Sequence, residues 1–156
     1  MQLTPHLTVA AVLSGLLAVP AGMAKSPALQ CPAGQQTVFA CATTNGKHVQ
    51  VCDAGATIGY RFGRPGQPPE LALNVPRNRA RTYQWPGAGR TTTYSVTVPN
   101  GDTRYTVYST FDRLADALDF QYGINVEVRG RQVANLRCRE DGLVDNLEGI
   151  DLPQDH

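Results

Sequence analysis

Histidine, a common general base and the commonest metal ligand, is scarce in this chain of 156 residues. There are three, and His6 and His156 stand near the two ends, which leaves His48 in a predicted hairpin arm. We interpret His48 as structural or solvated. No Cys-x-x-Cys pair is present, so the usual zinc and redox spacings are missing. The sequence therefore predicts no metal site and no cofactor.

Signatures of catalysis are missing as well. The chain has no Gly-x-Ser-x-Gly nucleophile turn and no glycine-rich phosphate loop between a strand and a helix. Only His48 could act as the base of a nucleophilic site. Nothing marks two of the 13 acidic residues as a glycosidase pair. We therefore predict a protein that is not an enzyme.

Long apolar runs are missing too. Residues 7–19 form an apolar run of 13 residues, whereas a membrane helix needs about 20. Pro20 ends the run, and small residues at 21–24 precede a possible cleavage point, which is typical of a secretory signal peptide. We predict a signal peptide at residues 1–24, no membrane span, and a soluble protein that is periplasmic or secreted.

What remains after residue 24 is the length of one domain. It contains all four cysteines, which are Cys31, Cys41, Cys52 and Cys138. An even number of cysteines in an exported chain predicts two disulfides, with three possible pairings. We expect a single β-domain over residues 25–138 and an acidic tail over residues 139–156 that is loosely docked or disordered.

Short β-rich runs separated by turn residues fill the domain. Hairpins are predicted around Asn45-Gly46, Asn100-Gly101 and Gly130-Arg131, and single strands at residues 57–62 and 70–75. A short extended piece is expected at residues 81–85, and the only helix-like segment is 112–120. The predicted fold is all-β. It is an antiparallel meander of about eight strands that forms a small barrel or sandwich, stapled by disulfides.

The Asn-Gly turns suggest a register for two hairpins. A two-residue loop at Asn45-Gly46 places Cys41 opposite Gln50, so Cys41 and Cys52 lie on a diagonal. A bond between them would need a bulge or twist, and Cys31 or Cys138 could pair with either cysteine. A loop at Asn100-Gly101 places Val98 opposite Thr103. One apolar face then collects Tyr94, Val96, Val98, Tyr105 and Val107.

Charge is distributed unevenly. Residues 61–90 carry six Arg and one Glu, a net charge of +5, whereas residues 139–156 carry a net charge of −5 with His neutral. Either these two regions attract each other or each faces a different partner.

The basic region contains the best binding candidates. Strand alternation points Ile58, Tyr60 and Phe62 into the core and Arg61 outward. Guanidinium groups and flat rings suit carboxylates, phosphates or sugars. The candidate binding residues are Arg61, Arg64, Arg77, Arg79, Arg81 and Trp85. In the alternative interpretation, the Arg residues of 77–81 only solvate a loop or hold the acidic tail.

Four stretches, TVFACATTNGKHVQVC, YRFGRPGQPPEL, YTVY and VANLRC, carry a resemblance. The chain resembles a group of small exported proteobacterial proteins with the pattern Phe-x-Cys, Gly-Lys, Val-Cys, Tyr-x-Phe-Gly-x-x-Gly, Glu-Leu, Tyr-x-Val-Tyr and Leu-x-Cys. The resemblance covers most of residues 37–138 and implies an exported single domain. In architecture the chain is more distantly similar to periplasmic inhibitors of c-type lysozymes, although their Ser-Gly-x-x-Tyr loop is absent.

These observations lead to one function and two alternatives. We predict an exported β-domain that binds a protein or an anionic cell-envelope component, in an inhibitor-like manner, and no nucleic acid. The alternatives are an envelope hydrolase with an unmarked active site and a small accessory subunit of an envelope complex.

Overall fold

The computed structural model describes residues 29–117 and 119–155, so the predicted signal peptide at residues 1–24 lies outside the described part. Within it, ten strands form two antiparallel sheets of five strands each. The first sheet has the order β10-β1-β2-β3-β4, and the second has the order β5-β6-β7-β8-β9. The strand bounds are β1 Gln36–Ala42, β2 His48–Asp53, β3 Thr57–Gly63, β4 Leu71–Pro76, β5 Arg81–Gln84, β6 Thr91–Asn100, β7 Thr103–Asp112, β8 Phe120–Val128, β9 Arg131–Arg137 and β10 Val144–Asp145.

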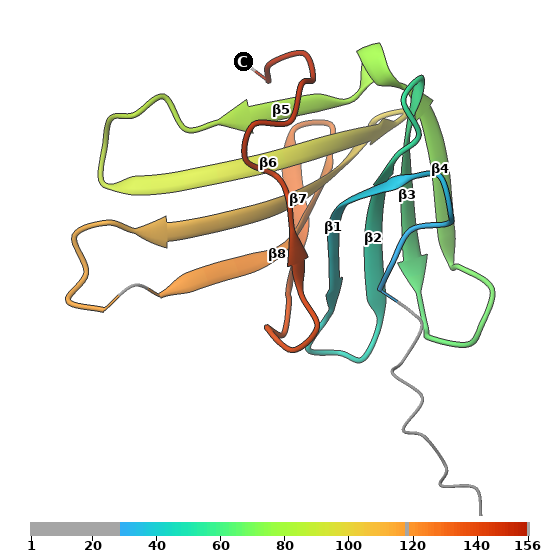
Figure 1. Cartoon of the computed structure of the whole chain (residues 1–156), viewed down its shortest axis with the longest axis horizontal. Helices are drawn as coiled ribbons and strands as arrows, with labels where there is room; N and C mark the ends of the chain where they lie inside the picture. Colours follow the sequence, from blue (N-terminus) through green and yellow to red (C-terminus); the bar gives the residue numbers. More distant parts are fainter. Residues whose placement is uncertain (1–28, 118, 156) are drawn as a thin grey trace, which may run out of the picture.

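The predicted all-β, antiparallel, disulfide-stapled fold is confirmed. Each sheet is a meander of consecutive strands, and β10 returns to pair with β1. The strands of the two sheets run across each other, and the sheets do not join into a closed cylinder (Figure 1). Of the two predicted architectures, the sandwich is therefore the one observed, with ten strands instead of about eight.

The core lies between the two sheets. Ile58 and Tyr60 of β3 face Val96, Val98 and Val107 of the second sheet, and all five are 0–2% exposed. The ring of Tyr60 contacts that of Tyr105 across the core, with centroids 5.2 Å apart. The inward faces predicted from strand alternation in β3 and in the second hairpin are thus confirmed.

The predicted hairpin registers need correction. Residues 44–46 form a three-residue loop, with φ +80° at Gly46, so Cys41 pairs with Val49 instead of Gln50. In the second hairpin the turn is at Gly101-Asp102, so Val98 faces Tyr105 instead of Thr103. This second error is two positions along the strand, an even number, so each side chain keeps its predicted face.

The third turn is also displaced by one residue. It is formed by Arg129 and Gly130, with φ values of +51° and +74°, and not by Gly130-Arg131. Two consecutive positive φ values are what a type I′ hairpin turn requires, since its twist matches that of the strands.

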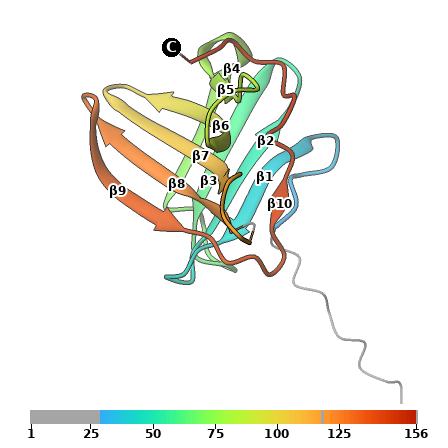
Figure 2. The same cartoon turned by 90° about the vertical axis from the view of Figure 1, so that its left-hand side faces the viewer.

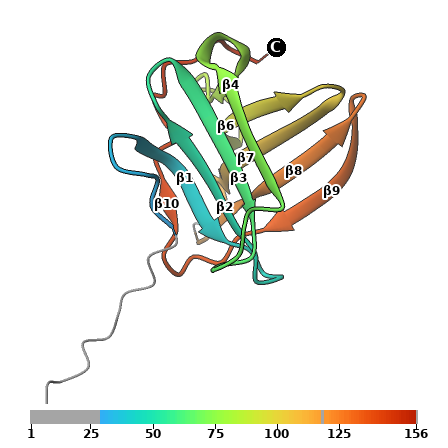
Figure 3. The same cartoon turned by 90° about the vertical axis from the view of Figure 1, so that its right-hand side faces the viewer.

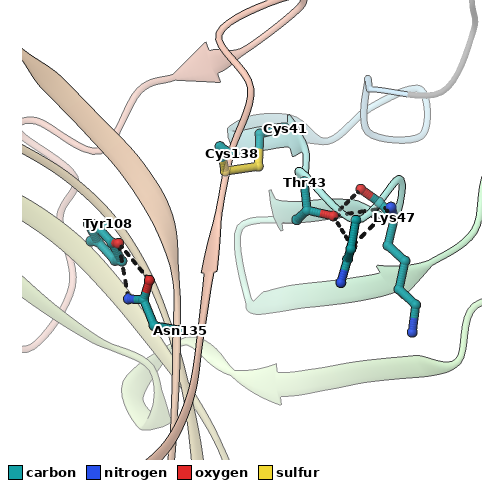
Figure 4. Close-up of a disulfide and its surroundings, with 7 residues drawn as sticks. Cys41, Thr43, Lys47, Tyr108, Asn135 and Cys138 are labelled. Carbon is teal, nitrogen blue, oxygen red and sulfur yellow. Dashed lines mark hydrogen bonds between the residues drawn. A yellow bond between two sulfur atoms is a disulfide. The ribbon is translucent and has the colours of Figure 1, made fainter.

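The disulfide pairing, which the sequence left open, is Cys31–Cys52 and Cys41–Cys138. The first bond holds the segment before β1 against β2. The second joins the end of β1 to the chain just after β9, and so ties the two sheets together (Figure 4). Two disulfides are typical of a protein that folds in an oxidising compartment.

The helix predicted at residues 112–120 is not formed. Strand β7 continues to Asp112 and β8 begins at Phe120, and residues 113–117 between them form turns. Leu114, one of the apolar residues whose spacing suggested the helix, is 73% exposed and so does not pack against the core. Among the described residues the only helix is the 3₁₀ turn η1, Arg77–Arg79. No helix in the described ranges combines the length and hydrophobicity that crossing a membrane requires.

The acidic tail is not loose or disordered, contrary to the sequence prediction. Its strand β10 pairs with β1, and its residues Leu147 and Leu152 are 0% and 6% exposed in the core. Gln154 forms a parallel bridge to Thr82 of β5, and the tail runs from one sheet to the other (Figures 1 and 2). The described part of the tail therefore belongs to the same core as the rest of the domain.

Candidate functional site

The candidate site lies on the outer face of the first sheet, which faces the viewer in Figure 3. Arg61 points outward from the middle of β3 because its neighbours Tyr60 and Phe62 point inward, as predicted. The sheet register places Gln50 of β2 and Ala72 of β4 on either side of Arg61. His48 is two residues before Gln50 on β2, so it lies on the same face, and it pairs with Gly63 of β3.

Two depressions meet at Arg61. The first has a volume of about 180 Å³ and lies between the outer face of β2 and β3 and the loop that follows β3. The second, of about 220 Å³, lies over β3 and β4. Residues lining the first include His48, Gln50, Arg61, Phe62, Gly63, Arg64 and Gln67, and those lining the second include Gln35, Thr57, Gly59, Arg61, Ala72 and Asn74.

Small residues explain why the surface is hollow there. Gly59 and Ala72 lie beside Arg61 and have no long side chain, so the surface around the Arg61 side chain is recessed. Gly63 lets the proline-rich loop fold back closely, because a Cβ atom there would lie 2.9 Å from the backbone nitrogen of Glu70. The loop from Arg64 to Pro69 thereby becomes one wall of the first depression.

The site carries positive charge. Within the described part of the chain, the guanidinium groups of Arg61 and Arg64 make no ion pair or hydrogen bond, and both residues are exposed. Nearby Lys47, by contrast, is held by Glu70 at 2.6 Å and lies over the Phe62 ring. The two arginines are thus the cations that remain available to a ligand.

His48 has an unusual environment at the edge of the first depression. Burial lowers the pKa of its imidazole, and the nearby charge of Arg139 lowers it further. Its Nδ1 atom is buried and has no hydrogen-bond partner among the described residues. At neutral pH this histidine is therefore mainly uncharged, and the positive charge of the site comes from the arginines.

The other predicted binding residues lie elsewhere, and two of them are occupied. Arg77 contacts the Asp53 carboxylate at 2.6 Å and donates to the backbone carbonyl of Asp151 at 2.7 Å. It therefore holds the tail, as the alternative interpretation expected. Arg81 donates to the backbone carbonyls of Asn78 and Ala80, within its own turn.

Arg79 and Trp85 complete the predicted set. Arg79 is exposed and makes no ion pair or hydrogen bond within residues 29–117 and 119–155. Trp85 donates from Nε1 to the carbonyl of Ala88 at 2.8 Å, and the guanidinium of Arg113 lies 4.5 Å from its ring centroid. Its ring is therefore already covered by a cation of the chain itself.

The structure does not bring the predicted set together. Arg64 follows the end of β3, whereas Arg77 follows Pro76, which pairs with Thr57 at the start of β3. Along a seven-residue strand these ends are about 20 Å apart. Trp85 follows β5, in the other sheet. Of the six predicted residues, Arg61 and Arg64 line the same depression.

Two lining residues, His48 and Gln50, were not among the predicted site residues. They alternate with Val49 and Val51, which are both 0% exposed, so strand alternation already placed the pair on the outer face. What the sequence could not supply was the register that sets Gln50 opposite Arg61.

Comparisons with known proteins identify no family for this chain. No protein-family model, no curated protein and no solved structure matches it significantly. The resemblance to small exported proteobacterial proteins therefore stays a prediction. In the described residues no three His, Cys, Asp or Glu side chains are grouped so that they could hold a metal ion. The chemistry of the site must be argued from its own residues.

Proposed function

We propose that this protein is an exported β-sandwich that binds an anionic group of a protein or cell-envelope component at Arg61. The observation that supports this most strongly is the position of Arg61. Its guanidinium stands where two depressions meet and has no partner in the described part of the chain, whereas nearby Lys47 and the more distant Arg77 are already paired.

The chemistry of the side chain defines the ligand class. A guanidinium stays charged at any physiological pH and offers a planar fork of donors that matches a carboxylate or a phosphate. Arg64, on the wall of the same depression, adds a second cation. An anion held between them would gain two charge-assisted interactions.

The size of the depressions limits what can bind. Volumes of about 180 and 220 Å³ are below the roughly 300–1,000 Å³ typical of pockets that enclose a whole small molecule. The site therefore suits one anionic group of a larger ligand, such as an acidic side chain, a chain-terminal carboxylate or a phosphate on a polymer.

Export is part of the proposal. The two disulfides, together with the predicted signal peptide, favour the periplasm or the extracellular space. Nucleic acid is not the expected anion in these compartments, whereas acidic proteins and envelope polymers are. The inhibitor-like role drawn from the lysozyme-inhibitor analogy stays a prediction.

The test is a binding isotherm of the purified, oxidised protein with inorganic phosphate, measured by calorimetry for four proteins. These are the wild type and the Arg61→Ala, Arg64→Ala and Arg79→Ala variants. We expect Arg61→Ala to weaken binding by about tenfold. A tenfold change in affinity corresponds to about 1.4 kcal/mol, close to the contribution of one charge-assisted hydrogen bond. Arg79→Ala is the matched control, an exposed arginine outside the site, and should bind like the wild type. Equal weakening by Arg61→Ala and Arg79→Ala would show only general charge attraction and reject the site.

A further inference from the structure

The outer face of the second sheet differs chemically from the Arg61 face. The strand pairings place one row of residues straight across the five strands of this sheet. From β5 to β9 the row is Tyr83, Ser95, Tyr108, Gly123 and Arg137. Along this row, the large residues Tyr83 and Tyr108 thus alternate with the small residues Ser95 and Gly123.

The ring of Tyr108 leans toward Gly123 on the neighbouring strand. A Cβ atom at Gly123 would lie 2.6 Å from the Oη and 2.8 Å from the Cζ of Tyr108, so the end of the ring occupies the space above this glycine. Only glycine leaves room for that position. Asn135 on β9 donates from Nδ2 to the Tyr108 Oη at 3.1 Å and fixes the ring there (Figure 4). The side chain of Tyr108 is partly exposed on this face.

Tyr83 supplies a second ring in the same row. It is 41% exposed, and Ser95, which separates it from Tyr108, is small. The two tyrosines stand on strands two places apart in the sheet, so their backbones are separated by about 9.6 Å. This separation is comparable to the length of two linked sugar rings.

Uncharged hydrogen-bonding groups flank the tyrosine row on both sides. One neighbouring row contains Thr106 and Asn125, and the other contains Thr93 and Thr110, whose hydroxyls bond each other at 2.8 Å. In the tyrosine row and the two rows beside it, β6, β7 and β8 contribute only uncharged side chains to this face. Arg104, Asp112 and Glu127 lie in the rows beyond, and Arg137 ends the tyrosine row on β9. The Arg90–Asp112 ion pair lies at one margin of the face. The Arg104–Asp155 pair reaches the row beside the tyrosines, where Asp155 accepts a hydrogen bond from the Thr97 hydroxyl at 3.3 Å.

We propose that this face binds a neutral oligosaccharide laid across the strands, with sugar rings stacked on Tyr108 and Tyr83. The apolar face of a pyranose packs on an aromatic ring, while its hydroxyl edge needs uncharged donors and acceptors such as the threonine and asparagine side chains beside the row. Charged side chains lie only at the edges of this area, at Arg137 and at the Arg104–Asp155 pair. The site is separate from Arg61, on the opposite side of the sandwich, and does not rest on the function proposed there.

The test is calorimetric titration of the oxidised protein with three neutral hexasaccharides, which are cellohexaose, maltohexaose and N-acetylchitohexaose. We expect at least one to bind the wild type. Tyr108→Ala should weaken binding by about tenfold, the upper end of an aromatic contact, and Tyr83→Ala should weaken it less. Tyr108→Phe, which keeps the ring, should retain most of the affinity. Phe120→Ala is the control, because it removes an exposed ring from the inner face of the same sheet.

Three outcomes would overturn the proposal. The first is that no hexasaccharide binds the wild type. The second is binding that Tyr108→Ala and Phe120→Ala change equally. The third is a dimer, detected by sedimentation, that Tyr108→Ala dissociates, since a second copy of the chain would then occupy this face. Because Tyr108→Phe leaves the packing over Gly123 almost unchanged, a folding defect in Tyr108→Ala would not hide the result.

Discussion

The two outer faces of this sandwich are built by the same strand alternation and yet have different chemistry. On the first sheet, glycine and alanine surround Arg61 and leave its charge without a partner above two depressions. On the second sheet, threonines bond to one another in pairs and a tyrosine ring covers a glycine. Small residues therefore leave a cation exposed on one face and make room for an aromatic ring on the other. The effect of a small residue depends on the side chains beside it.

The two sheets are also held in different ways. The first contains three of the four bonded cysteines in or beside its strands, whereas the second relies on two ten-residue strands, β6 and β7, paired along their whole length. Removing a disulfide and removing a packed side chain should therefore lower the free energy of unfolding by different amounts.

The largest effect is expected from the disulfide that joins the sheets. Replacing Cys41 and Cys138 by serine should lower the free energy of unfolding by about 4–5 kcal/mol, because that bond closes a loop of 97 residues. The same change at Cys31 and Cys52, separated by 21 residues, should cost about 3 kcal/mol. Urea unfolding monitored by circular dichroism measures both. Equal losses, or a larger loss for the shorter loop, would contradict this order.

The tail provides the next test, because it packs against both sheets. Leu147→Ala should lower the free energy of unfolding by about 2–5 kcal/mol, since it leaves a cavity at a fully buried site. Leu114→Ala, in the exposed loop between β7 and β8, should change it by less than about 0.5 kcal/mol. Urea unfolding of both variants separates the tail from the loop. A Leu147→Ala protein as stable as the wild type would mean that the tail is loose after all.

These two leucines show what could and could not be predicted from sequence. The strands β3 and β4 follow directly from alternation of apolar residues, and so does the outward position of Arg61. The tail has no such alternation. Its buried residues Leu147 and Leu152 are spaced irregularly, because they fit into a core built by other strands. Leu114 has helical spacing but finds nothing to pack against.

The candidate site was predictable to a similar degree. Arginines far apart in sequence were grouped by composition, but Arg77 folds against Asp53 and the tail, whereas Arg61 remains unpaired. That distinction depends on hairpin registers and on tail docking. Both are set by loop geometry and long-range packing and are not written in the local pattern.

The paired and unpaired arginines give a third test. Arg77→Ala should lower the free energy of unfolding by about 1–2 kcal/mol, since it removes a partly buried ion pair and a bond to the tail. Arg79→Ala, in the same 3₁₀ turn, should have an effect within about 0.5 kcal/mol. Thermal unfolding of the two variants provides the measurement. If Arg79→Ala were the more damaging, Arg77 would not be the residue that holds the tail.

The smallest effect concerns pH and is confined to the first sheet. The folded-state pKa of His48 is lowered below its ordinary value of 6.5, so the unfolded state binds more protons between the two values. The contribution of His48 to stability is complete above pH 6.5 and should fall as pH decreases through that range. His48→Gln should flatten the stability curve below about pH 6.5. A variant with the same slope as the wild type would assign the slope to other groups.

The central claim, that the Arg61 face is an anion site, is tested most directly by one ¹⁵N NMR titration of the oxidised wild-type protein with inorganic phosphate. We predict that the amide signals of Gln50, Gly63 and Arg64 shift with saturation, while those of Tyr108 and Gly123, on the opposite face, do not. Shifts that are spread evenly over all exposed arginines, or that leave Gln50 and Gly63 unmoved, would contradict the claim.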